Sequence, residues 1–249
     1  MQTARAILFD LDDTLAESFQ APKPEMVERL SRLLEKFPIG IITAAGWPRI
    51  EEQFLTPLSV SSHIENFYVF PNSSSQCHVW ENGAWKMEYN LLLTDDERAR
   101  ITSALTEASH EADIIDPRFE SRILDRGTQI AYAAIGLDAS LEEKKAWDPD
   151  QSKRKKLKAL IESKVPDVEV LIGGMTTIDI TKKGINKSYG VKWFSERLNV
   201  PTSEILYVGD AFYEGGNDRV VIPTGIQIHQ TSGPEETLHI IDDLLQQLS

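Results

Sequence analysis

The fold of this chain is decided by the stretch Ala4-Arg5-Ala6-Ile7-Leu8-Phe9-Asp10-Leu11-Asp12-Asp13-Thr14. Residues 4–10 form a short apolar run that ends in an acid, which indicates a buried strand. In open parallel sheets, ligands bind beyond the carboxyl ends of the strands. Asp10 and Asp12 therefore stand where chemistry normally occurs. A D-x-D-x-T pattern alone is weak, because acidic surface turns produce it often.

A second apolar strand near the other end of the chain also finishes in a carboxylate. Residues 205–208 run into Gly209 and Asp210, and a glycine-rich turn then leads to Asp218. A solvated turn is the plainer interpretation, but strand-end acids at both ends of the chain favour a shared site. Asp10, Asp12, Asp210 and Asp218 repel one another if their strands are neighbours, unless a cation joins them. Oxygen ligands alone favour a hard ion, so the pattern predicts Mg²⁺ rather than zinc.

Apolar periodicity predicts alternating strands and helices on both sides of a differently patterned middle block. This alternation is typical of a parallel sheet with helices on its faces, and it predicts an α/β protein. The elements expected in this part are helices at residues 24–37, 50–55, 187–198 and 235–248, and strands at residues 4–10, 39–43, 67–70 and 205–208.

The pattern of predicted strands and helices in the middle block is typical of a separate α+β domain. We predict a hairpin in residues 77–92 with its turn at 81–83, and a helix at 94–111 capped by Thr94. Further strands are expected at 129–135, 168–172 and 176–180, and a helix at 152–163. We therefore predict a core domain of residues 1–80 and 184–249, split by an inserted domain of residues 81–183.

Lys187 follows Gly184-Ile185-Asn186 at the start of the helix that re-enters the core. Most lysines are solvated surface residues. This one lies where the predicted carboxylate group needs a positive charge, so we include it in the candidate site.

Composition excludes several classes of function. The chain has 249 residues, 41% hydrophobic and 26% charged, as in ordinary globular proteins. Its single cysteine, Cys77, allows no intrachain disulfide. A net charge of −13 argues against nucleic acid as a partner, and an anionic substrate would need a metal or placed cations. No apolar run reaches the roughly 18 residues that span a bilayer, so we expect a cytoplasmic protein without a membrane partner.

These motifs, in this order, resemble the haloacid dehalogenase (HAD) superfamily of phosphatases and phosphomutases, subfamily IIB. The resemblance implies a Rossmann-like core with a parallel sheet and a C2-type α+β cap domain inserted after the second motif. Within the superfamily the chain is similar to eukaryotic-type phosphomannomutase and to sugar-phosphate phosphatases. That similarity rests on Gly209-Asp210 with residues 215–218, on residues 172–187, and on Ile135-Gly136 preceded by Arg126.

The resemblance assigns a role to each acid. Asp10 is expected to attack phosphorus and form an aspartyl-phosphate, and Asp12 to exchange a proton with the leaving and entering oxygens. Mg²⁺ is expected on Asp10, Asp210 and the backbone carbonyl of Asp12, with Asp218 as a further ligand or an orienting group. Lys187 is expected to pair with Asp10 and with the phosphoryl oxygens.

The second motif departs from the family pattern. A serine or threonine usually binds phosphate where this chain has Ala45, directly before Gly46. Either Thr43 or the backbone N–H groups of residues 44–46 would have to serve instead.

Whether the chain is a phosphatase or a mutase depends on a second, remote phosphate site. Arg126, Thr177 and Asp179 match binding residues of the phosphomannomutase cap, but Phe19 and Leu137 stand where those enzymes have arginines. We therefore predict a Mg²⁺-dependent phosphatase acting on a sugar phosphate or a similar small phosphomonoester, with phosphomannomutase as the alternative. The resemblance also implies a homodimer formed through the cap. An inert binding module or a scaffold is disfavoured, because all of the motif acids are present.

Overall fold

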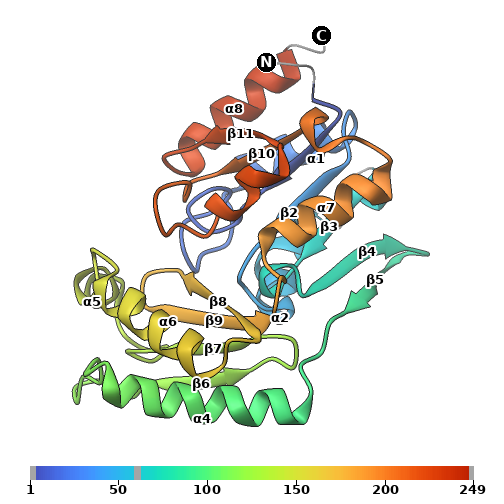
Figure 1. Ribbon diagram of the computed structural model, residues 1–249. Helices are drawn as coiled ribbons and strands as arrows, with labels where there is room; N and C mark the ends of the chain where they lie inside the picture. The colour runs from blue at the N-terminus through green and yellow to red at the C-terminus, as the bar shows by residue number, and fades with distance from the viewer. Residues whose placement is uncertain (1–3, 59–62, 247–249) are drawn as a thin grey trace. The chain divides into compact units, whose positions relative to one another are not determined.

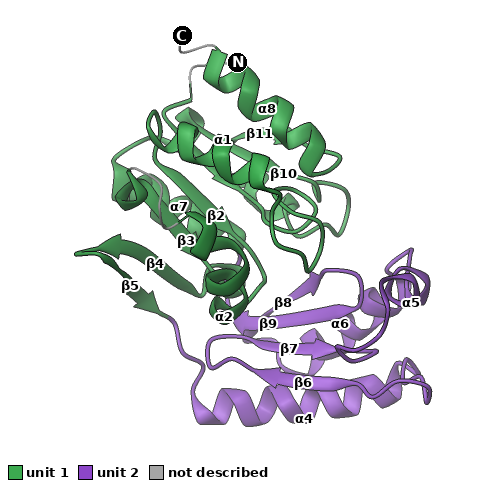
Figure 2. Cartoon of the chain, turned by 180° about the vertical axis from the view of Figure 1, so that it is seen from behind, with its two compact units in different colours: residues 1–90, 187–249 green, residues 91–186 purple. Residues whose placement is uncertain are grey.

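The computed structural model describes residues 4–58 and 63–246, and the chain divides into two compact units (Figure 2). Unit 1 comprises Met1–Asn90 and Lys187–Ser249, and unit 2 is Leu91–Asn186. The boundary predicted between residues 80 and 81 would cut a hairpin whose two strands both belong to the sheet of unit 1. The hairpin therefore extends the core sheet rather than opening the inserted domain.

Unit 1 is built on a seven-stranded sheet in the order β11-β10-β1-β2-β3-β4-β5. The strands from β11 to β3 run parallel, and β4 and β5 are antiparallel additions at one edge. Their bounds are β1 (Ala6–Phe9), β2 (Ile39–Ile42), β3 (Phe67–Phe70), β4 (Gln76–Glu81), β5 (Ala84–Asn90), β10 (Ile205–Gly209) and β11 (Gln227–Gln230).

Helices cover both faces of this sheet (Figure 1). Ile7 and Phe9 of β1 share a core with Met26 of α1 and Ile241 of α8, while Leu8 packs on the other face with residues of α7. The period-two alternation of a strand thus divides β1 between two apolar layers. The helical segments of unit 1 are α1 (Pro24–Leu34), α2 (Trp47–Ile50), the π-helical η1 (Glu51–Leu55), α3 (Thr56–Leu58), α7 (Lys187–Leu198), α8 (Pro234–Gln246), and the 3₁₀ segments η2 (Ile64–Asn66), η3 (Asn72–Ser74), η4 (Thr202–Glu204) and η5 (Arg219–Thr224).

The register of the central strands determines where the motif acids lie. Phe9 of β1 is paired with Val208 of β10 on one side and with Ile41 of β2 on the other. The residues that follow these strands, Asp10, Asp210 and Thr43, consequently leave the same edge of the sheet. This edge holds the candidate site.

Unit 2 is a four-stranded antiparallel sheet in the order β6-β7-β9-β8, with helices packed on one face. Ile178 and Ile180 of β9 share a core with residues of α4 and α6, so Thr177 and Asp179 lie on the opposite face. The elements are α4 (Asp95–Glu111), β6 (Arg122–Asp125), β7 (Ile130–Ala133), α5 (Leu141–Trp147), α6 (Ser152–Lys164), β8 (Val168–Gly173) and β9 (Thr177–Lys182).

The predicted α/β class and most predicted elements are confirmed. Thr94 forms the expected cap, and its side chain accepts a hydrogen bond from Glu97 N. Strands β6 and β11 and helix α5 were not predicted, and the predicted helix at 235–248 ends in two residues outside the described ranges. No helix within residues 4–58 and 63–246 has the length and apolar character to cross a membrane.

Candidate active site

Asp10 lies directly after β1 and is almost completely buried, with 4% of its surface exposed. Its backbone N–H donates to Val208 O at 2.9 Å, which continues the pairing of β1 with β10 past the end of the strand. Burial raises the pKa of the Asp10 carboxyl well above its ordinary value; Lys187 opposes that shift, and the charges of Asp218 and Asp210 add to it. Positive charge beside Asp10, from Lys187 or from a bound cation, therefore favours its ionised form.

Lys187 supplies the positive charge that the sequence predicted. Its Nζ lies 2.7 Å from Asp10 Oδ1 and 2.7 Å from Asp218 Oδ1, and the residue is 2% exposed. Burial alone would lower the pKa of the ammonium, but the two carboxylates raise it above its ordinary value. Lys187 is consequently a fixed cation between two acids.

Asp218 is held in place by three donors. Its Oδ1 accepts from Lys187 Nζ and from the Tyr207 hydroxyl at 2.6 Å, and its Oδ2 accepts from Ala211 N at 3.0 Å. A side chain at Gly209 would meet Asp218 Oδ2 at 2.4 Å, so a glycine is required there for Asp218 to reach this position. These contacts favour the orienting role for Asp218 over that of a direct ligand.

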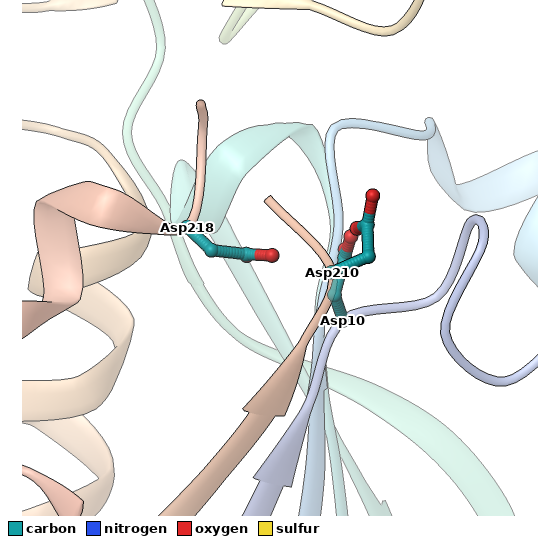
Figure 3. A group of neighbouring side chains, drawn as sticks. All are labelled: Asp10, Asp210 and Asp218. Carbon is teal, nitrogen blue, oxygen red and sulfur yellow. The ribbon is translucent and has the colours of Figure 1, made fainter. Parts of the chain in front are cut away.

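Asp10, Asp210 and Asp218 form the three-carboxylate group in which one ligand atom of each lies within 4.8 Å of the others (Figure 3). Burial raises the pKa of Asp210 to about 7, and the charge of Asp218 contributes. Three acids against one ammonium leave surplus negative charge that a divalent cation would offset. An all-oxygen donor set with surplus negative charge fits Mg²⁺.

The side chain of Asp12 is not part of this carboxylate group as found among the described residues. It instead forms a bidentate ion pair with Arg49, in which Nη1 donates to Oδ2 at 2.9 Å and Nη2 to Oδ1 at 2.5 Å. Arg49 was missed by sequence reasoning, since nothing local in residues 47–50 links this arginine to Asp12. The proposed contact of the Asp12 carbonyl with a metal remains a prediction.

Thr43 and Ala45 line the turn after β2. Thr43 is 1% exposed, and its Oγ1 accepts a hydrogen bond from Ala45 N at 3.1 Å. Because a threonine hydroxyl has one hydrogen as well as two lone pairs, the Thr43 O–H can still donate. Gly46 precedes α2 in an extended conformation. The Ala45 N–H already donates its hydrogen bond to Thr43. The Thr43 hydroxyl is therefore the favoured hydrogen-bond donor to phosphate.

A strained segment that follows β3 forms hydrogen bonds with the turn after β2. Asn72, Ser73 and Ser74 have φ values of 51°, 56° and 72°, in the left-handed region that non-glycine residues rarely occupy. Asn72 N donates to Ala45 O at 2.9 Å, and Ser73 N to Thr43 O at 2.8 Å. Such strain is typical of segments that support functional sites.

The predicted binding residues of unit 2 form a second, separate group. Side-chain atoms of Thr177 and Asp179 both lie over Gly173, where an added Cβ would meet them at 2.6 and 2.2 Å. Burial raises the pKa of Asp179 to about 6, and the charge of Arg126 partly opposes this. Arg126 also donates to Gln129 Oε1 at 2.7 Å. Thr177, Asp179 and Arg126 are thus brought together as predicted, within unit 2 alone.

Comparisons with known proteins give the fold first and then the family. Solved structures with the same fold include IMP-bound IMP-nucleotidase of Plasmodium falciparum, with a TM-score of 0.74 at 17% identity over 98% of this chain and 69% of that one. Another is the C-terminal domain of trehalose-6-phosphate phosphatase of C. albicans, with a TM-score of 0.68 at 15% identity over 99% of this chain and 94% of that one. These similarities show the fold that the chain shares with both enzymes.

Sequence comparison then gives the family. A family model described as eukaryotic phosphomannomutase matches residues 26–247, and the chain belongs to that family. A curated relative, the phosphomannomutase of Triticum aestivum, is 26% identical over 93% of this chain and 91% of its own length. This family and the fold of the structural neighbours together define a phosphoryl-transfer enzyme of the HAD type.

Proposed function

We propose that this enzyme is a Mg²⁺-dependent phosphatase that hydrolyses a sugar phosphate or a similar small phosphomonoester. Its reaction passes through an aspartyl-phosphate on Asp10. The observation that carries hydrolysis over isomerisation is the apolar character of Phe19 and Leu137, which are 50% and 47% exposed. Both stand at positions where the resemblance predicts phosphate-binding arginines. Two lost charge-assisted contacts amount to about 3–6 kcal/mol of binding to a remote phosphate.

Two other cations of unit 2, Arg154 and Lys183, are engaged in contacts within that unit. Arg154 is 3% exposed and bound in an internal pair with Asp148 at 2.8 Å. Lys183 donates to Val168 O at 3.1 Å. Arg126, near Asp179, is the cation of this group, and a single guanidinium offers a second phosphate fewer charge-assisted contacts than the three arginines that the resemblance predicts.

In the first half of the proposed reaction, Asp10 attacks phosphorus and the bond to the leaving oxygen breaks. The Asp12 carboxyl gives its proton to that oxygen. Lys187 holds Asp10 in position and stabilises the charge that grows on the phosphoryl oxygens, and Thr43 donates to one of them. In the second half, water attacks the aspartyl-phosphate, Asp12 takes the proton of that water, and inorganic phosphate leaves.

Asp10 and Asp210 are the groups proposed to hold Mg²⁺, with Asp218 keeping Lys187 and the metal site aligned. The ion would supply positive charge to the nucleophile and to the phosphoryl oxygens. Recognition of the rest of the substrate is proposed for Arg126, Thr177 and Asp179.

Phosphomannomutase activity is the second candidate. The match of residues 26–247 to the phosphomannomutase family favours it, as does the grouping of Thr177 and Asp179 over Gly173. A mutase must rebind the same intermediate in the opposite orientation without losing its phosphate to water.

The test is phosphate release against isomerisation on mannose 1-phosphate and a panel of small sugar phosphates, with Mg²⁺ and with or without a hexose bisphosphate. We expect free phosphate from at least one ester, and a loss of about a thousandfold or more in D10N. Conversion of mannose 1-phosphate to mannose 6-phosphate that depends on the bisphosphate, with little free phosphate, would establish the mutase instead.

A further inference from the structure

The Arg49 side chain contacts three residues of unit 1, Gln53, Phe19 and Asp12. Its Nε donates to Gln53 Oε1 at 3.1 Å, and its guanidinium carbon lies 5.2 Å from the centroid of the Phe19 ring. The two terminal nitrogens are thereby left for Asp12, with which they form the bidentate pair. A planar fork held by a ring and an amide is pre-organised, so little side-chain entropy is lost on pairing.

The loop after the first motif is shaped to complete this arrangement. Phe19 has a φ of 65°, an outlier for a bulky residue, and in this conformation its N–H donates to Asp12 Oδ1 at 3.0 Å. Asp13 accepts from Ser18 N at 3.0 Å and from Ser18 Oγ at 2.7 Å, which closes the turn that presents Phe19. Strain retained beside a catalytic group is evidence of a functional constraint.

The two oxygens of Asp12 are held unequally. Oδ1 accepts from both Arg49 Nη2 and Phe19 N. Within residues 4–58 and 63–246, the one hydrogen bond to Oδ2 comes from Arg49 Nη1, and it is the longer of the two bonds to the guanidinium. The side chains of Arg49 and Asp12 are 23% and 29% exposed, so the pair is accessible to a substrate. When the hydrogen bond from Arg49 Nη1 is released, Oδ2 can turn toward a reacting oxygen. Oδ1 meanwhile keeps its hydrogen bonds from Arg49 Nη2 and Phe19 N.

We propose that Arg49 is a positioning residue that anchors Asp12 through Oδ1 and leaves Oδ2 to exchange the proton. This inference rests on the proposed function. The proton on Oδ2 passes to the leaving oxygen as the bond to phosphorus breaks, and Oδ2 later takes a proton from the attacking water. In both halves of the reaction Arg49 keeps the carboxyl aimed, and misplacement of such a group by about 1 Å lowers the rate roughly a hundredfold.

Two substrates with different leaving groups can distinguish a role of Arg49 in positioning Asp12 from a general role in stabilising the fold. An alkyl phosphate needs its leaving oxygen protonated, whereas 4-nitrophenyl phosphate has a leaving group that is stable as an anion. We expect R49Q to lower kcat/KM for the alkyl ester by about 10- to 100-fold, and for the nitrophenyl ester by less than about threefold. R49K keeps the charge without the fork, and we expect it to resemble R49Q. Combining R49Q with D12N should give no further loss on the alkyl ester than D12N alone.

R29Q is the matched control. Arg29 forms a pair of similar exposure with Asp242, 26% against 33% exposed, between α1 and α8. We expect R29Q to leave kcat/KM for both esters unchanged. Equal losses on the two esters in R49Q, or losses that add to those of D12N, would overturn the assignment.

A readout without turnover separates this inference from the proposed function. Side-chain ¹⁵N spectra should reveal one guanidinium with hindered rotation, assigned to Arg49 by its absence in R49Q and released to free rotation in D12N. If the wild type hydrolyses neither ester, the proposed function fails, and these spectra still decide the pairing. A freely rotating Arg49 in the wild-type protein would overturn the inference.

Discussion

Both units bury carboxylates, but they balance them differently. In unit 1, Asp10, Asp210 and Asp218 gather around the single ammonium of Lys187. In unit 2, Asp148 is matched one to one by Arg154, and its carboxylate also accepts from the backbone N–H groups of Lys153 and Arg154. Arg154 in turn donates to Gly173 O on β8. A matched pair fixes structure, whereas a surplus of acids disfavours folding unless something binds them. We therefore propose the surplus of acids in unit 1 as the functional site.

The largest effect on stability is expected where the balanced pair is broken. R154M removes the partner of Asp148 and the donor to Gly173 O, and it leaves a buried charge without compensation. We expect the free energy of unfolding to fall by about 3–5 kcal/mol, measured by urea denaturation.

R100M is the control for R154M. Arg100 also makes a bidentate pair, with Asp167 at 3.0 and 2.8 Å, but on the exposed surface of unit 2. Because solvent screens this exposed pair, R100M should lower the free energy of unfolding far less than R154M does. Equal effects of the two substitutions would show that burial does not distinguish the pairs.

A smaller effect is expected at Asp179, the unbalanced acid of unit 2. Its pKa is raised from 3.8 to about 6 in the folded protein, so the folded state binds more protons than the unfolded state between these values. Stability from this group is fully present below pH 3.8 and is lost as pH rises to about 6. D179N, which cannot ionise, should match the wild type at low pH and exceed it by up to about 3 kcal/mol above pH 6.

Urea unfolding of both proteins across pH 4 to 8 is the measurement. A constant difference between D179N and the wild type would mean that Asp179 keeps its ordinary pKa and is not an unbalanced acid of unit 2.

The smallest effect on stability is expected from the metal. Mg²⁺ at about a hundredfold its dissociation constant should stabilise the wild type by about 2.7 kcal/mol, seen as a higher Tm. D210N should lose most of that gain, because it removes an acid of the three-carboxylate group. D242N, which removes an acid on α8, should retain it. A full gain in D210N would place the ion elsewhere.

Local patterns were enough to predict the elements that carry the site. Strand β3 and helix α7 begin and end where the apolar periodicity predicted, and Thr94 caps α4 because its signal lies within one helical turn. Lys187 was identified by its place at the start of a helix, and the structure puts it 2.7 Å from Asp10.

The features that were missed depend on contacts between distant parts of the chain. The alternation in β4 and β5 predicts a hairpin but does not say which sheet the hairpin joins, and it pairs with β3 in the core. Arg49 reaches Asp12 across 37 positions. Helix α5, only seven residues long, is too short to display a periodicity.

The position of β1 between β2 and β10 has a consequence for synthesis of the protein. Arg5, next to β1, contacts Glu204, 199 positions later in the chain. At ordinary translation speeds, Asp10 emerges roughly 10 to 40 s before Asp210 and Asp218. The residues of unit 2 are contiguous and can fold during that interval. Asp10 of a nascent chain therefore waits for the acids of the distant strand end, and the three-carboxylate group assembles only after Asp210 and Asp218 have been synthesised.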